Sequence, residues 1–223
     1  MRNTFDRFNG RHQDYQAARP SYAQEFLDWL GELYAPPERY TAADIGSGTG
    51  KLSAQLLAAG FRVCGVEPNP DMRGAAEALL GGDPRFSSSN GTDHDTGLPD
   101  RSVDMVAAGQ AFHWFDGPAF ARECRRILRP GGRAVLVWNV RGSAPMNQAL
   151  AQVFREHCPS FHGFTGGMGE DDPRIRDFFG GAYEKRRFPN PLTLDRDQFL
   201  RRCFSSSYAL REGDCLLYTS DAA

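Results

Sequence analysis

The sequence has no long apolar run and no run of like charge. Its 223 residues include 26 Lys and Arg against 28 Asp and Glu, a net charge of −2. Such a balanced chain lacks the electrostatic pattern with which proteins hold nucleic acid or an anionic membrane surface. No stretch approaches the length of a membrane span, and the first residues contain no apolar segment of a signal peptide. We therefore expect a cytoplasmic protein, a monomer or weak homodimer, with neither nucleic acid nor membrane as partner.

Cysteine and histidine are sparse, and neither is spaced as metal ligands are. The five cysteines, at positions 64, 124, 158, 203 and 215, show no paired spacing. Cys64 and Cys124 fall inside apolar segments, so we expect reduced, buried thiols. The five histidines, at positions 12, 94, 113, 157 and 162, lack the spacing of a zinc site. No metal is expected.

The chain does have a glycine-rich turn, residues 46–50, between a short apolar stretch and a helical pattern. Glycines at such a turn let a ligand approach the backbone, and the following helix offers free N–H groups. A dinucleotide fingerprint needs its third glycine at Lys51, and a phosphate-binding P-loop needs Ser or Thr at Leu52. S-adenosylmethionine fits better, because the carboxylate of Asp44 can accept a hydrogen bond from its ammonium group. A plain tight turn of an α/β protein is the alternative.

A second candidate carboxylate, Glu67, stands at the end of the next apolar run. The apolar run 62–66 ends at Glu67, which is 23 residues after Asp44. An acidic residue at the tip of the second strand, about 20 residues beyond the glycine turn, suits hydrogen bonds to both ribose hydroxyls of a nucleoside.

Apolar runs alternate with helical patterns along most of the chain. We expect strands at 40–45, 62–67, 85–89, 103–109 and 133–139, and helices at 49–59, 70–80 and 118–128. An earlier helix begins near Ser21, with Gln24 completing a capping box, and ends before Pro36. This alternation predicts an α/β fold, a Rossmann-like, doubly wound and mostly parallel sheet with helices on both faces. Ligands of such sheets bind beyond the carboxyl ends of the strands.

Several ordered motifs resemble class I S-adenosylmethionine-dependent methyltransferases of the methyltransferase type 11 group, which act on small molecules. They are ADIGSGTGKLS, VEPNPDMR, NGTDHDTGLPDRSVDMVAAGQAFHWFD and CRRILRPGGRAVLVWN, preceded by FNGRHQDYQAARPSY and followed later by SSSY. The resemblance covers roughly residues 5–140. It implies S-adenosylmethionine as cofactor, S-adenosylhomocysteine as product, and in-line transfer of a methyl group to a small-molecule acceptor. A non-catalytic S-adenosylmethionine-binding module and, less favoured by the glycine spacing, an NAD-dependent oxidoreductase are the alternatives.

The resemblance also assigns site residues. Cofactor-binding positions are Asp44, Gly46, Ser47, Gly48, Gly50, Glu67, Pro68, Met72, Thr92, Asp93, His94, Gly109, Gln110, Tyr15 and Arg19. Residues 92–94 occupy the loop that reads the adenine edge, although a solvated polar loop explains His94 equally well. Arg19 is expected to pair with the methionine carboxylate, or to be an ordinary surface arginine before Pro20.

On the acceptor side the resemblance places His113, Trp114 and Asn139. His113 is a candidate general base, because its unperturbed pKa lies near neutrality. The alternative is that the aromatic cluster 112–115 is packing beside the adenine. Asn139 either lines the acceptor pocket or satisfies the end of a strand.

We divide the chain into three parts. Residues 1–140 are expected to form the cofactor-binding core with its lead-in helix, and residues 141–214 to continue the same domain. Within the second range we expect a helix at 144–157, a substrate-side lid at 158–180, an edge strand at 184–194 and a helix capped by Asp195. Residues 215–223 resemble translated sequencing-adapter sequence, so we expect a non-native tail and a missing final antiparallel strand. No segment of the predicted acceptor pocket carries a distinctive charge cluster.

Overall fold

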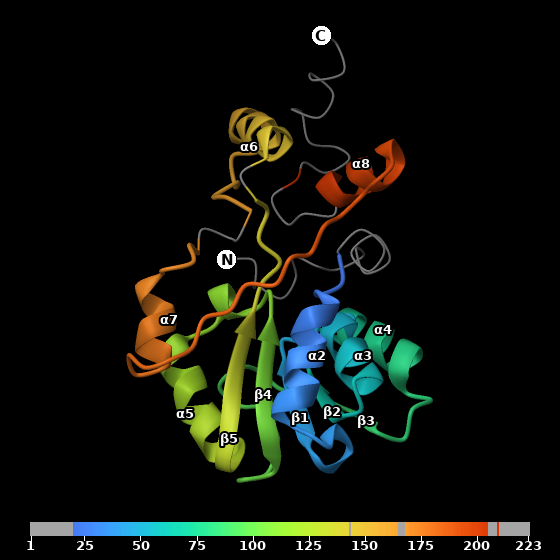
Figure 1. The fold of residues 1–223 in the computed structure, drawn as a ribbon, viewed down its shortest axis with the longest axis vertical. Coiled ribbons are helices and arrows are strands. Elements are labelled where there is room, and N and C mark those ends of the chain that lie inside the picture. The colour runs from blue at the N-terminus through green and yellow to red at the C-terminus, as the bar shows by residue number, and fades with distance from the viewer. Residues whose placement is uncertain (1–19, 143, 165–167, 205–208, 210–223) are drawn as a thin grey trace.

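The computed structural model describes residues 20–142, 144–164, 168–204 and 209, and its core is a five-stranded sheet (Figure 1). The strand order is β3-β2-β1-β4-β5, and every neighbouring pair runs parallel. The chain reverses its direction of travel across the sheet between β1 and β4, whose carboxyl ends therefore form the switch point where ligands of such sheets bind. The strands are β1 (Thr41–Ile45), β2 (Arg62–Val66), β3 (Phe86–Ser89), β4 (Val103–Gly109) and β5 (Leu128–Val137).

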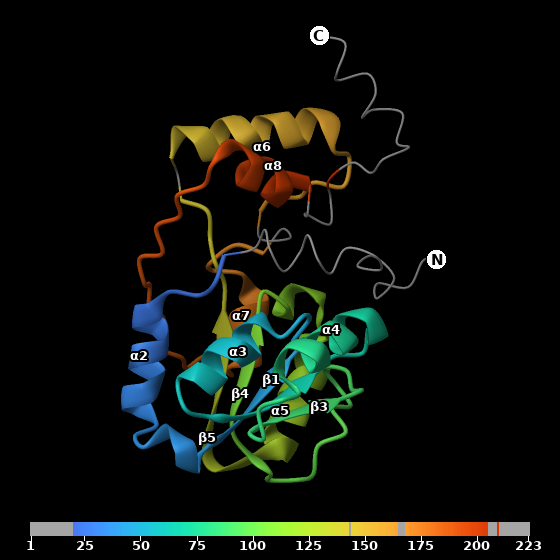
Figure 2. The ribbon, with the colours of Figure 1, turned by 90° about the vertical axis from the view of Figure 1, so that its right-hand side faces the viewer.

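Helices cover both faces of the sheet, each over its own apolar core (Figure 2). On one face lie α2 (Gln24–Leu33), α3 (Lys51–Ala58) and α4 (Pro70–Leu80). On the other lie α5 (Gly117–Ile127) and α7 (Pro173–Phe178). Alternate residues of β4 serve the two cores, since Met105 faces the α2 side and Val106 faces the α5 side. The predicted Rossmann-like, doubly wound parallel sheet is confirmed.

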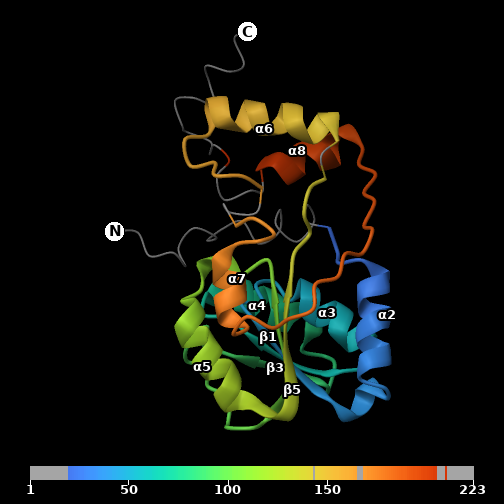
Figure 3. The same ribbon diagram turned by 60° about the vertical axis from the view of Figure 1, so that its left-hand side comes forward.

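Beyond the carboxyl ends of the strands stands a small unit that we call the cap (Figure 3). It consists of α6 (Pro145–His157), residues 158–164 and α8 (Arg196–Phe204). The cap has an apolar core of its own, made by Ala151, Phe154, Cys158, Phe161 and Cys203. Two short 3-10 helices, η2 (Pro37–Arg39) and η3 (Phe112–Trp114), complete the described elements.

The predicted lid at 158–180 is not one unit. Its first part belongs to the cap, whereas α7 packs on α5 in the sheet core. The rings of Phe178 and Phe120 stack with centroids 5.1 Å apart. Apolar side chains at 175 and 178, one helical turn apart, therefore join the core and do not cover a substrate.

Two local predictions are wrong. Ser21 and Gln24 form no capping box, because α2 starts after Ala23 without a side-chain cap, and Gln24 donates to Asp28 instead. Residues 184–194 form no strand: Pro189 and Pro191 offer no N–H to a neighbour. That segment crosses back toward α2 (Figure 1).

Two further predictions about the C-terminal third are confirmed. The helix expected at 144–157 is α6, and Asp195 caps α8, its Oδ1 accepting from the N–H of Gln198 at 2.8 Å. The four cysteines in the described residues are all buried and free. No helix in the described part of the chain combines the length and the apolar character that crossing a bilayer requires.

Candidate functional site

The glycine turn connects the carboxyl end of β1 to α3. Gly46, Gly48 and Gly50 have φ angles of 68°, 57° and 82°, a backbone region that favours glycine. A side chain at Gly48 would meet nothing within 4 Å, so the backbone is open to a ligand there. A Cβ at Gly46 would lie 2.8 Å from the Cβ of Ala111, and one at Gly50 would lie 2.9 Å from Leu80 Cδ1. The turn is thus packed at both ends and open in its middle.

Glu67, at the tip of β2, holds the open part of this turn. Its Oε2 accepts a hydrogen bond from the N–H of Gly48, and its Oε1 accepts one from the N–H of Asn69, both at 2.9 Å. Burial raises the pKa of Glu67, and these two backbone donors act against the rise. A carboxylate offers about four acceptor positions. Two of them remain for hydroxyl donors of a ligand.

Asp44 lies at the floor of the site, only 1% exposed. Its Oδ2 accepts a hydrogen bond of 2.7 Å from the hydroxyl of Ser53 on α3. Burial raises the pKa of Asp44 to about 7, although the hydrogen bond from Ser53 opposes the shift. The carboxyl group is therefore poised to ionise near neutral pH when a cation approaches.

A pocket opens directly above this turn and brings together seven of the predicted residues. These are Asp44, Gly46, Ser47, Gly48, Gly109, Gln110 and Asn139. The other lining residues are Pro20, Tyr22, Thr49, Lys51, Leu52, Arg141, Phe164 and Arg202, the last two from the cap. The pocket thus spans the switch point of the sheet and the underside of the cap.

Gln110 and Asn139 shape the far wall of the pocket, at the ends of β4 and β5. Gln110 has a φ of 57°, uncommon for a residue with a side chain, and its amide donates to the carbonyl of Asn139 at 3.2 Å. The amide of Asn139 in turn donates to the carbonyl of Ser21 at 3.2 Å. Asn190 donates to the side-chain oxygen of Asn139 at 2.8 Å. Asn139 therefore both lines the pocket and ties the segment before α2 to the strand end.

The loop 92–94 lies on the side of the site toward α5 and does not line the pocket. Asp93 accepts hydrogen bonds from the N–H of Asp116 at 3.0 Å and from the His94 ring at 3.2 Å. Thr92 accepts from the N–H of Asp95 at 3.1 Å. Backbone contacts thus fix the loop and leave the ring of His94 largely exposed.

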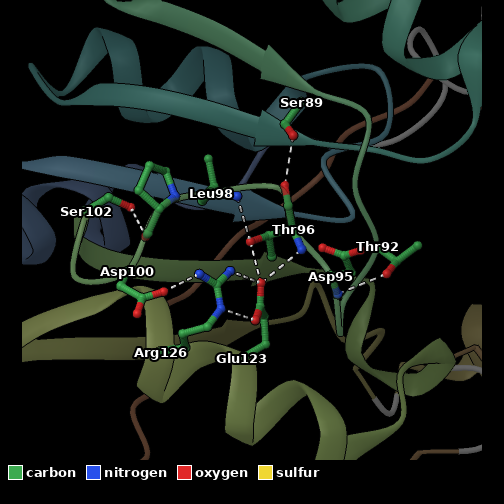
Figure 4. Close-up of polar contacts among 10 residues, drawn as sticks. Ser89, Thr92, Asp95, Thr96, Leu98, Asp100, Ser102, Glu123 and Arg126 are labelled. Atoms are coloured by element: carbon green, nitrogen blue, oxygen red, sulfur yellow. Dashed lines mark hydrogen bonds and ion pairs between the residues drawn. The ribbon is translucent and has the colours of Figure 1, made fainter.

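Glu123 of α5 anchors the next residues of this loop (Figure 4). Its carboxylate accepts from the N–H of Thr96 at 2.9 Å and from the Thr96 hydroxyl at 2.6 Å. Arg126 closes the other side with hydrogen bonds of 2.7 and 2.8 Å. The Thr96 carbonyl accepts from Ser89 at the end of β3. One buried carboxylate therefore connects α5, the loop and β3.

His113 and Trp114 lie in η3, just after the tip of β4, and do not line the pocket. Their ring centroids are 4.7 Å apart, and Trp114 is 39% exposed. Phe112 and Phe115 turn the other way, into the core beside Phe120. These two phenylalanines therefore pack in the core, whereas the expected place of the cluster beside the adenine stays a prediction.

The pocket lining does not include Glu67, Pro68, Met72 or Gly50, and Tyr15 and Arg19 fall outside the described residues. Pro68 precedes Asn69, whose side chain caps α4 by accepting hydrogen bonds from the N–H groups of Asp71 and Met72. Gly50 packs on α4, outside the pocket lining. No group of three potential metal ligands gathers within the described ranges.

Sequence reasoning missed several pocket residues. The sequence could have indicated two of them as ligand-binding residues: Thr49 stands inside the glycine turn, and Tyr22 is the last residue of the motif FNGRHQDYQAARPSY. The hydroxyl of Tyr22 stands over Gly109, where a Cβ would collide with it. The Thr49 hydroxyl is buried and has no hydrogen-bond partner in the part of the chain that the structure describes. Arg141, Phe164 and Arg202 belong to no local pattern.

These features fit S-adenosylmethionine. An open backbone at Gly48, a buried hydroxyl at Thr49 and the carboxyl groups of Asp44 and Glu67 together offer donors and acceptors to an amino-acid tail and a ribose. A pyrophosphate would instead meet two carboxyl groups, which repel it once ionised.

Comparison with known proteins identifies the family. A model of the type 11 methyltransferase domain matches residues 43–136. An uncharacterized methyltransferase of Mycobacterium bovis is 42% identical over 127 residues, 57% of this chain and 49% of that protein. An uncharacterized methyltransferase-like protein of Schizosaccharomyces pombe is 31% identical over 209 residues, 89% of this chain and 77% of that protein.

Among solved structures, a candidate type II methyltransferase from Anaeromyxobacter dehalogenans superposes with a TM-score of 0.57 at 31% identity, covering 85% of this chain and 79% of that one. The match to the mycobacterial protein spans about half of that protein's length. The chain belongs to the class I S-adenosylmethionine-dependent methyltransferases of the type 11 family.

Proposed function

We propose that the protein transfers a methyl group from S-adenosylmethionine to a small-molecule acceptor that binds between the glycine turn and the cap. The observation that carries this proposal is the shared pocket, whose floor is Asp44 and the glycine turn and whose outer wall includes Phe164 and Arg202 of the cap. A donor site and an acceptor site that meet in one pocket are what a direct transfer requires.

Different residues would bind different parts of S-adenosylmethionine. Glu67 would bind the ribose hydroxyls, Asp44 the ammonium group, and Gly48 and Thr49 the adjoining polar atoms. The loop 92–94, fixed by Asp93, would border the adenine with Pro68 and Met72. Gly109 and Gln110 would face the reactive sulfur, and Tyr15 and Arg19 would cover the amino-acid tail.

When bound, S-adenosylmethionine supplies a methyl group carried by a positively charged sulfur. A lone pair of the acceptor would attack the methyl carbon opposite the sulfur, and the electron pair of the broken sulfur–carbon bond would stay on sulfur. The protein's task is then positioning and exclusion of water. For an acceptor that must lose a proton, His113 is the proposed base, although it lies in η3 outside the pocket lining, so the acceptor would have to reach it beyond the tip of β4. Asn139, which lines the pocket, would contact the acceptor side.

A thermal shift experiment tests the proposal against its alternatives. We expect S-adenosylhomocysteine to raise the melting temperature and NADH to leave it unchanged, since a ligand stabilises the folded state that binds it. A folded sample with no shift by S-adenosylhomocysteine would contradict the methyltransferase function. A shift without turnover on any acceptor would favour the non-catalytic module.

The pKa of Asp44 makes a second prediction about the donor. Because burial raises this pKa to about 7, an ammonium ligand must bind the ionised form and release a proton below that pH. The affinity for S-adenosylhomocysteine should therefore rise about 10-fold between pH 6 and 8 and change little above it. Isothermal titration in buffers of different ionisation enthalpy measures both the affinity and the released proton.

Two variants serve as controls for this pH dependence. Asp44→Asn should bind more weakly and lose the dependence. Ser53→Ala removes the hydrogen bond that lowers the pKa of Asp44, so its midpoint should move to higher pH. An affinity that is flat from pH 6 to 8 in the wild type would rule out contact between Asp44 and the ammonium group.

A further inference from the structure

Residues 20–22, which precede α2, form one wall of the pocket. Pro20 and Tyr22 line it directly. The side-chain amide of Asn139 donates hydrogen bonds to the carbonyls of Pro20 and Ser21 at 3.3 and 3.2 Å. A third hydrogen bond, 2.8 Å long, joins the amide of Asn190 to the same Ser21 carbonyl. Two side chains from distant parts of the chain therefore fix this wall near the end of β5.

Gln55 of α3 holds the main chain of Tyr22 at two points. Its Oε1 accepts a hydrogen bond from the N–H of Tyr22 at 2.8 Å, and its Nε2 donates one to the Tyr22 carbonyl at 3.0 Å. The ring of Tyr22 belongs to the apolar core on the α2 side of the sheet, with its centroid 6.3 Å from that of Phe26. Only 8% of the residue is exposed. Both the backbone and the ring of Tyr22 are thus fixed before a ligand binds, which lowers the entropic cost of a contact with it.

The hydroxyl of Tyr22 reaches the end of β4, where Gly109 leaves room for it. A Cβ on Gly109 would collide with the Tyr22 oxygen, so only glycine allows this approach. Leu52 borders the same point, since that Cβ would also lie 3.1 Å from its Cδ2. Tyr22, Leu52 and Gly109 all line the pocket. The oxygen therefore stands at the switch point between β1 and β4, beside the residue that we assign to the reactive sulfur.

Building on the proposed function, we propose that the phenol oxygen of Tyr22 contacts the methyl group on the sulfonium of S-adenosylmethionine, and that Gln55 is its positioning residue. The methyl hydrogens share the positive charge of the sulfur, so an oxygen lone pair attracts them more strongly than those of a neutral group. A phenol oxygen can donate its own proton to one partner and still accept from another, so the contact does not require a free hydroxyl. S-adenosylhomocysteine has a neutral sulfur and no methyl group on it. Tyr22 should therefore favour binding of the donor over binding of the product.

Tyr22→Phe tests this contact, because it removes the oxygen and keeps the ring that packs near Phe26. Isothermal titration of S-adenosylmethionine and of S-adenosylhomocysteine, each without an acceptor, gives two dissociation constants and their ratio for every variant. We expect Tyr22→Phe to bind S-adenosylmethionine about 5- to 10-fold more weakly and S-adenosylhomocysteine within about 2-fold of the wild type. Thermal melting without ligand shows that the variant is folded.

Tyr34→Phe is the matched control. Tyr34 is a buried tyrosine of the same apolar core, but its hydroxyl donates to the carbonyl of Asp104 at 3.4 Å, near the start of β4 and outside the pocket lining. The ratio of its two dissociation constants should equal that of the wild type.

Gln55→Met gives a second measurement that leaves the hydroxyl in the protein. It keeps the approximate length of the side chain and removes both hydrogen bonds to the main chain of Tyr22. The preference for S-adenosylmethionine over S-adenosylhomocysteine should therefore fall about 2- to 5-fold. In the Tyr22→Phe background the same substitution should leave the ratio unchanged, because the oxygen that Gln55 positions is gone.

The two ligands separate this contact from the other roles that Tyr22 could have. Equal losses for both ligands in Tyr22→Phe would mean that the hydroxyl holds a part common to both, such as the amino-acid tail, and would overturn the proposal. Unchanged affinities for both ligands, or a changed ratio in Tyr34→Phe, would overturn it too. If Tyr22→Phe does not fold, an unchanged ratio in Gln55→Met overturns the proposal by itself. A wild-type protein that binds neither ligand would instead contradict the proposed function.

Discussion

Replacing Glu67 by alanine should weaken the binding of S-adenosylhomocysteine by at least about 100-fold and abolish the thermal shift it produces. Glu67 uses two acceptor positions on the N–H groups of Gly48 and Asn69. Its two remaining positions are assigned here to the ribose hydroxyls, and each hydrogen bond to a charged group contributes about 1.5–3 kcal/mol. Isothermal titration with the purified variant measures the loss.

The same variant loses two structural hydrogen bonds, so the ribose contact needs a separate measurement. An S-adenosylhomocysteine analogue without the 2′-hydroxyl should bind the wild type more weakly, but should bind Glu67→Ala about as well as the parent ligand does. Glu77→Ala, an exposed carboxylate on α4, is the control and should bind normally. If the variant discriminates between the two ligands as strongly as the wild type, Glu67 does not contact the ribose.

The part of the site that sequence reasoning located is the part made by single strand ends. Asp44 lies one residue before the end of β1, Glu67 follows directly after β2, and parallel strands bring their carboxyl ends to one edge of the sheet. The spacing of the glycines indicated that the turn after β1 binds neither a dinucleotide nor a phosphate in the usual way. Such features are local in the chain, and the alternation of strands and helices determines how they meet.

The cap side of the site depends on contacts that no local pattern encodes. Arg141, Phe164 and Arg202 meet because α6 and α8 share an apolar core, which includes Phe154 and Cys203. The expected strand at 184–194 is absent for a local reason, because Pro189 and Pro191 offer no N–H to a neighbouring strand. The position of this segment depends on tertiary contacts, since Phe188 packs on Phe26 of α2 with ring centroids 5.8 Å apart.

Glu123→Gln should lower the free energy of unfolding by about 3 kcal/mol at pH 7. Burial would raise the pKa of Glu123, but hydrogen bonds from Arg126 and then Thr96 outweigh it and hold the pKa at about 2. A folded pKa below the unfolded value of about 4.5 stabilises the protein above that pH, and the stabilisation is lost as the pH falls toward 2. Urea denaturation at several pH values measures the difference between variant and wild type.

The pH dependence distinguishes the ionised network from simple packing. The difference between Glu123→Gln and the wild type should shrink to less than half at about pH 3, because the wild type loses the advantage that the variant never had. Asp100→Asn removes the exposed partner of the same Arg126 and should cost less than about 1 kcal/mol. A difference that stays constant with pH would show that the charge on Glu123 contributes nothing. Glu123 binds Thr96, and Asp93 and His94 lie just before Thr96 in the loop. Glu123→Gln should therefore also weaken S-adenosylhomocysteine binding, by less than Glu67→Ala does. Thr96→Val should lower both the stability and the affinity in the same way.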